Sequence, residues 1–131
     1  MPTAPSSSIL LAAEALLPEI VAVRRRLHRR PEIGLRLPES QAIVVEELSR
    51  LGLTPTLGRE TTSVTTTIDG AGPGPTILLR ADMDALPLLE ETGLEFASEI
   101  EGAMHACGHD THVAMLLGAA RLLSDRRSTN T

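Results

Sequence analysis

A short apolar run over residues 76–79 constrains the fold of this chain more than any other feature. Strands that are covered on both faces form continuous apolar segments, whereas half-exposed strands alternate apolar and polar residues. A breaker rich in Gly and Pro, residues 70–75, separates this run from residues 61–68, which are rich in Thr and Val. The sequence therefore predicts an α/β fold in which strands over residues 61–68 and 76–84 lie side by side.

Helical spacing of apolar residues predicts helices that pack on this mixed sheet. The first lies between residues 16 and 30, with Pro18 near its start and Pro31 ending it; residues 1–15 are predicted to be a loose leader. The second spans residues 39–51, with Gly52 as its C-terminal cap. A third helix follows residue 110, and it is predicted to be buried because it is apolar on nearly every side, with Val113, Ala114, Met115, Leu116, Leu117, Ala120 and Leu123.

Composition narrows the classes of function. The chain has 131 residues, enough for one domain, a net charge of −5 and a single aromatic residue, Phe96. Five arginines within residues 24–30 are consistent with an anionic partner. The preferred interpretation is a solvated helix end that complements the helix dipole. The acidic balance and the lack of aromatics argue against a nucleic-acid partner.

We also expect no membrane partner, because no stretch of the sequence reaches the ~18 apolar residues that a membrane span requires. One cysteine, Cys107, excludes an internal disulfide and fits a reducing compartment. We therefore expect a cytoplasmic protein.

Two carboxylates, Asp82 and Asp84, follow the apolar run. Residues two apart lie on the same face of a strand, and open α/β sheets bind ligands beyond the carboxyl ends of their strands. These acids are therefore candidate site residues. The alternative is that they are solvated strand-end acids, or that one of them pairs with Arg80.

The strongest chemical signal is a cluster over residues 104–112. Three of the four histidines and the only cysteine lie within eight residues of this segment. Cys107 and His109 have the Cys-x-His spacing that lets both side chains reach one zinc-like ion, and Gly108 permits a tight backbone path. Asp110 and Thr111 can cap the following helix. The alternative is a buried free cysteine beside incidental histidines.

Three segments, residues 27–34 (LHRRPEIG), 80–87 (RADMDALP) and 105–110 (HACGHD), resemble in order and spacing three motifs of the M20 metallopeptidases. The resemblance is to the amidohydrolase branch, which contains hippurate hydrolases and auxin-conjugate hydrolases. It implies that Cys107 and His109 bind metal and that Asp84 is a catalytic residue that holds the site in order. Asp82 lies where other M20 branches carry a metal-binding histidine. His28 is expected to secure the turn at Pro31.

The resemblance also implies an activity: hydrolysis of the amide bond of N-acyl amino acids at two divalent ions, Mn²⁺ or Zn²⁺. Members of the family use a glutamate as general base, from a Glu-Glu pair downstream of the buried helix, and no such pair follows that helix in this sequence. We therefore expect residues 16–127 to be the N-terminal part of a zinc-peptidase-like catalytic domain, incomplete and followed by a truncated tail at 128–131. Alone, the chain is expected to be inactive. The complete enzyme is expected to be able to form a homo-oligomer. The alternative is a non-catalytic fragment that acts as a structural or regulatory partner of a full-length copy.

Overall fold

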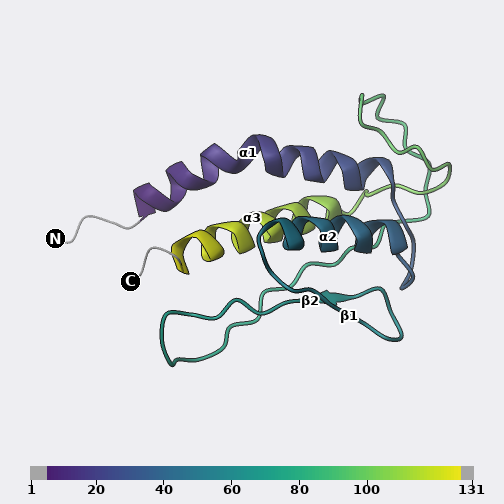
Figure 1. The fold of residues 1–131 in the computed structure, drawn as a ribbon. Helices are drawn as coiled ribbons and strands as arrows, with labels where there is room; N and C mark the ends of the chain where they lie inside the picture. Colours follow the sequence, from purple (N-terminus) through teal and green to yellow (C-terminus); the bar gives the residue numbers. More distant parts are fainter. Residues whose placement is uncertain (1–5, 128–131) are drawn as a thin grey trace.

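The computed structural model describes residues 6–127. Figure 1 shows the helices α1 (Ser6–Arg29), α2 (Pro38–Arg50) and α3 (His109–Arg127) lying over a small hairpin, with α1 and α3 running in opposite directions. A two-stranded antiparallel sheet forms the hairpin, with Thr56 opposite Thr65. The strands of this hairpin are β1 (Thr56–Leu57) and β2 (Val64–Thr65).

The loose leader predicted for residues 1–15 is wrong from Ser6 onward, because α1 begins there. Residues 1–5 lie outside the described part of the chain. The segment is rich in Leu and Ala, which are strong helix formers, and this propensity carries the helix past Pro18. Proline cannot donate to the carbonyl of Glu14, but this part of α1 is exposed, so water can bind the freed carbonyl.

The core lies where the three helices meet. Leu27 of α1 is 1% exposed and is among the most deeply buried side chains. Gly118 lets α1 and α3 approach closely, since a Cβ at this position would lie 2.6 Å from Cδ1 of Ile20. The buried core cluster is entirely aliphatic, as expected for a chain with one aromatic residue; it contains Leu27, Ile43, Val44, Leu48, Leu53, Val113, Leu117 and Ala120.

Both ends of α2 are held by specific contacts. The Glu32 carboxylate accepts hydrogen bonds from the backbone N–H groups of Glu39 and Ser40, at 3.0 and 2.8 Å. Gly52 has a φ of +72° and donates its N–H to Ser49, while Leu53 donates to Leu48. This is a Schellman motif, so the predicted C-terminal cap at Gly52 is confirmed.

The prediction that α3 is buried on nearly every side is wrong. One face packs on α1 and α2, whereas Met115 is 53% exposed and Leu123 is 48% exposed. Apolar residues on every side of a helix indicate how much apolar surface it could bury. They do not indicate whether another part of the chain covers each face.

The α/β class is confirmed, but the predicted strand over residues 76–84 is wrong. This segment forms no strand, and β2 pairs with β1 instead. Ile77, Leu78 and Leu79 are 79%, 86% and 51% exposed, so the run is not covered on both faces. Within residues 6–127, parallel pairing is limited to an isolated bridge between Ile33 and Ala85.

Within residues 6–127, none of the helices combines the length and apolarity needed to cross a bilayer.

Candidate metal and catalytic site

The candidate site forms where the extended segment of residues 76–86 meets the loop before α3. An antiparallel bridge between Leu86 and Met104 brings these two parts of the chain together. His109, the first residue of α3, then lies beside Asp84: its Nδ1 is 2.9 Å from the Asp84 carbonyl oxygen and 3.0 Å from Oδ1. Asp84, a candidate site residue from the sequence, therefore lies beside the candidate ligand His109.

This contact defines how His109 presents its ring. A carbonyl oxygen can only accept a hydrogen bond, so Nδ1 of His109 carries the proton and donates to Asp84. Nε2 is then left with its lone pair. A hydrogen bond from the ring nitrogen that does not face the metal is the usual way in which proteins orient a histidine that binds metal.

Cys107 lies two residues before His109 as an exposed free thiol. Gly108 between them has a φ of +80°, and its carbonyl accepts the N–H groups of Thr111 and His112. The left-handed conformation that this turn requires is one that glycine adopts without strain. The turn therefore starts α3, and the two candidate ligands lie on either side of Gly108 at the beginning of this helix.

The donor set fits a zinc-like ion in its chemistry, since thiolate and imidazole nitrogen are preferred ligands. It is small, however. In the described part of the chain, no group of three or more His, Cys, Asp or Glu side chains is arranged to hold a metal ion. Catalytic zinc sites generally have three protein ligands, so Cys107 and His109 amount to part of such a site.

Asp82 takes the alternative that the sequence left open for these acids. Its carboxylate accepts a hydrogen bond from Nη2 of Arg80 at 2.5 Å, and its side chain is 47% exposed. Asp82 and Asp84 therefore have different partners, although they are two residues apart.

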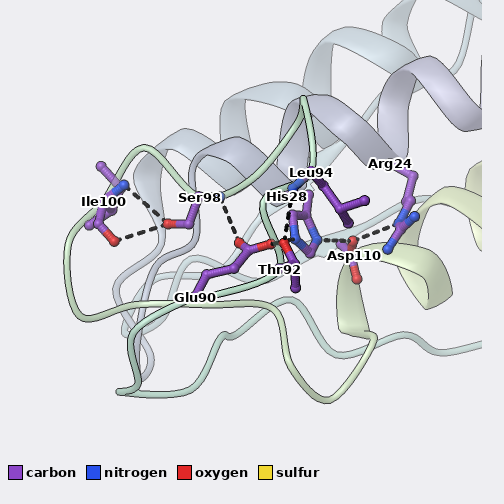
Figure 2. Close-up of polar contacts among 8 residues, drawn as sticks. All are labelled: Arg24, His28, Glu90, Thr92, Leu94, Ser98, Ile100 and Asp110. Carbon is purple, nitrogen blue, oxygen red and sulfur yellow. Dashed lines mark hydrogen bonds and ion pairs between the residues drawn. The ribbon is translucent and has the colours of Figure 1, made fainter.

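A second polar cluster lies in the interior behind this site (Figure 2). Asp110, the second residue of α3, is fully buried, and its Oδ2 accepts hydrogen bonds from Arg24 Nε at 2.9 Å and His28 Nδ1 at 2.8 Å. The other ring nitrogen of His28 lies 3.1 Å from Oε1 of Glu90. The expectation that His28 secures the turn at Pro31 is therefore wrong: its ring joins two distant carboxylates.

The environment of these carboxylates keeps them ionised. Burial raises the pKa of Asp110, but hydrogen bonds from His28, Arg24 and the Thr111 N–H outweigh it, so the pKa lies below its usual range. Burial likewise raises the pKa of Glu90, and hydrogen bonds led by that of Thr92 lower it below the usual range.

His105 completes the interior cluster. It is 4% exposed, and neither ring nitrogen has a hydrogen-bond partner within the described residues. Burial lowers its pKa, with the charge of Asp110 acting in the opposite direction, so the neutral form is favoured.

Sequence reasoning missed Arg24 and Glu90 as members of this cluster, and it treated Asp110 only as a helix cap. Arg24 and Asp110 are 86 residues apart, and His28 and Glu90 are 62 residues apart. No local pattern links such positions. The arginine run lies at a solvated helix end, as expected, since the side chains of Arg26 and Arg30 are 42% and 49% exposed. Arg24, Arg26 and Arg30 also pair with carboxylates.

This chain is similar to known proteins in sequence and in fold. The model for peptidase family M20/M25/M40 matches residues 78–131. The chain is 50% identical over 105 residues to thermostable carboxypeptidase 1 of Saccharolobus solfataricus, an alignment that covers 79% of this chain and 27% of that protein. The chain belongs to peptidase family M20/M25/M40.

Two further M20 relatives show which share of such a protein this chain covers. It is 44% identical over 109 residues to an N-acyl-L-amino acid amidohydrolase of Geobacillus stearothermophilus, covering 83% of the chain and 30% of that protein. The crystal structure of the Bacillus subtilis YXEP protein, described as a dinuclear metal-binding peptidase of the M20 family, superposes with a TM-score of 0.82 at 38% identity. That match covers 88% of this chain and 32% of YXEP. The chain thus spans about 27–32% of the length of these relatives.

Proposed function

We propose that this M20 chain carries part of the active site of a metal-dependent amidohydrolase that cleaves the amide bond of N-acyl amino acids. The observation that carries the proposal is the contact between Asp84 and Nδ1 of His109, which leaves Nε2 free to bind a metal beside Cys107. The substrate class is supported by relatives named as an N-acyl-L-amino acid amidohydrolase and an N-acetyl-L-cysteine deacetylase.

In this proposal Cys107 and His109 hold a divalent ion, Zn²⁺ or Mn²⁺, in a site that takes two ions when complete. When bound, such ions polarise an amide carbonyl and make a water molecule more acidic. Asp84 accepts the hydrogen bond from Nδ1 of His109 and so orients the imidazole, which leaves Nε2 available to a metal. A thiolate ligand needs reducing conditions, which supports a cytoplasmic location.

We further propose that the chain alone has no significant amidohydrolase activity. Two ligands leave an ion mostly hydrated, and a general base is needed to activate the water. The described residues offer no third ligand in the required arrangement.

A role as a non-catalytic partner of a full-length copy is the second candidate. It is favoured by the exposed Ile77, Leu78 and Leu79, because exposed extended apolar segments readily accept another strand. Co-purification of the chain with a full-length M20 relative tests it, and Leu78→Lys is expected to weaken that association.

Titration calorimetry with Zn²⁺ and with Mn²⁺ tests the metal site. Cys107→Ala and His109→Ala are each expected to abolish most of the binding. Asp84→Asn is expected to lower the affinity about 10–100-fold, as the loss of a group that orients a ligand generally does. His112→Ala is the matched control: it is an exposed histidine whose ring lies 5.9 Å from that of His109, and its loss should leave the affinity unchanged.

A hydrolysis assay with an N-acetyl amino acid, run beside the calorimetry, tests the activity. Unchanged affinity in Cys107→Ala would contradict the ligand assignment. Robust metal-dependent turnover by the chain alone would contradict the proposal that it is inactive.

A further inference from the structure

His28 lies between two buried carboxylates that come from different parts of the chain. Its Nδ1 is 2.8 Å from Asp110 of α3, and its Nε2 is 3.1 Å from Glu90 in the loop that follows the extended segment. The side chains of His28, Glu90 and Asp110 are 3%, 2% and 0% exposed. The two hydrogen bonds are therefore shielded from solvent, and Figure 2 shows them in line with the contact from Arg24.

The hydrogen-bonding inventory decides the form of the ring. Ionised carboxylates only accept hydrogen bonds, and a neutral imidazole has a single N–H. Contacts from both ring nitrogens thus require both to donate. With the N–H of Arg24, each of the two buried carboxylates then has hydrogen-bond donors, which is the arrangement in which buried carboxylates are tolerated.

The other groups that face His28 are consistent with this assignment. The ring of His105 lies 6.3 Å away and is held neutral by its burial, so it adds no positive charge. The Phe96 ring meets His28 edge to face at 5.4 Å, and it also packs under the guanidinium groups of Arg24 and Arg25. Phe96 therefore docks the same loop on α1 through its side chain.

Each carboxylate organises the backbone around it. Glu90 accepts hydrogen bonds from Thr92 Oγ1 at 2.5 Å and from the Ser98 N–H at 2.6 Å, which closes the loop of residues 90–98. Asp110 lies in the first turn of α3, directly after the candidate ligand His109. A single ring therefore joins the loop to the start of the helix that carries the ligand.

We propose that His28 is a positioning residue: by donating from both ring nitrogens to Glu90 and Asp110, it fixes the first turn of α3, and with it His109, against the loop of residues 90–98. The part that concerns His109 rests on the proposed metal site. The bridge itself does not.

Nuclear magnetic resonance on the metal-free chain tests the bridge directly. The ¹⁵N shifts of the His28 ring at neutral pH should show protons on both nitrogens; a neutral tautomer would overturn the proposal. The Ser98 amide reports on the loop, and the His112 amide, which donates to Gly108, reports on the first turn of α3. In His28→Gln both amides should exchange at least tenfold faster, because glutamine presents an oxygen to one of the two carboxylates. Unchanged exchange at both would overturn the proposal.

Variants at Glu90 separate the two arms and serve if His28→Gln does not fold. Glu90→Ala removes only the loop arm, so the Ser98 amide should lose protection while the His112 amide keeps it. Glu90→Gln can still accept the hydrogen bond from His28, so Ser98 should stay protected. Equal loss of protection at both amides in Glu90→Ala would show general destabilisation and would overturn the positioning role.

Zn²⁺ affinity distinguishes a positioning role from a merely structural one. His28→Gln is expected to weaken binding about tenfold at a temperature where the variant is folded. Leu27→Ala, which destabilises the adjacent core position without touching the bridge, should bind as the wild type does; equal weakening in both variants would overturn the role toward His109. If the wild-type chain binds no Zn²⁺, the proposed metal site fails, while the ring shifts and amide exchange still decide the bridge.

Discussion

The helical core and the apolar run of residues 76–79 contain the same kind of side chain in opposite surroundings. Leu27 in α1 is 1% exposed, whereas Leu78 in the extended segment is 86% exposed. The helices find their partners in one another, and the core cluster draws on α1, α2 and α3. Nothing within residues 6–127 covers both faces of the run. Hydrophobicity therefore states that a segment needs a partner, while only the topology of the chain decides whether it has one.

The difference has consequences for the two regions. Burial of the helical faces supplies the free energy that holds residues 6–127 together. An exposed extended segment contributes little to that stability and remains open to strands of other chains.

Replacing a core leucine should be costly, and replacing one in the run should not. Leu27→Ala is expected to lower the free energy of unfolding by about 2–5 kcal/mol, because it removes buried methyl groups and leaves a cavity. Leu78→Ala should change it by less than about 0.5 kcal/mol. Denaturant unfolding of both variants measures this, and similar losses in both would break the comparison.

The loop beyond the run should depend on pH through Glu90. Since the folded-state pKa of Glu90 lies below its ordinary value of 4.5, the group stabilises the fold above that value. This contribution is lost as the pH falls from about 4.5 through the folded-state pKa. Glu90→Gln should be less stable than the wild type at neutral pH, and the gap should close on acidification. Unfolding curves of both across this range decide it, with the exposed Glu101→Gln as control.

Backbone conformation should matter at the end of α2. Gly52→Ala is expected to cost about 1–2 kcal/mol, because a side chain at a φ of +72° is strained. Gly74→Ala is the matched control: Gly74 has no positive φ and no neighbour within 4 Å of an added Cβ. Thermal unfolding compares the two, and equal melting temperatures would contradict the assignment of Gly52 as the cap.

Charge in the run should change association more than folding. Leu78→Lys is expected to leave the free energy of unfolding within about 0.5 kcal/mol of the wild type, since the side chain is 86% exposed. It should lower any self-association, because lysine on an exposed edge opposes strand addition. Sedimentation velocity over a concentration series measures this. A large loss of stability would show that Leu78 is buried against a partner after all.

Much of the fold follows from local patterns along the chain. Periodic apolar residues located α2 and α3, and Gly52 marked the end of α2. These features depend on neighbours within a few residues along the chain. The contact of Asp84 with His109 is of another kind, because residues 76–84 form no strand whose end a sheet could place there.

Other features of the chain depend on contacts that no local pattern encodes. The apolar run predicted a strand buried on both faces. Because β2 pairs with β1 and residues 76–84 form no strand, the run is exposed instead. The sequence shows that His28 has two ring nitrogens that need partners if it is buried. It does not show that these partners are Glu90 and Asp110, which lie 62 and 82 residues away. The sequence by itself determined which groups must be buried, capped or paired. Only the tertiary structure decided which partners they meet, because those partners come together through folding of the whole chain.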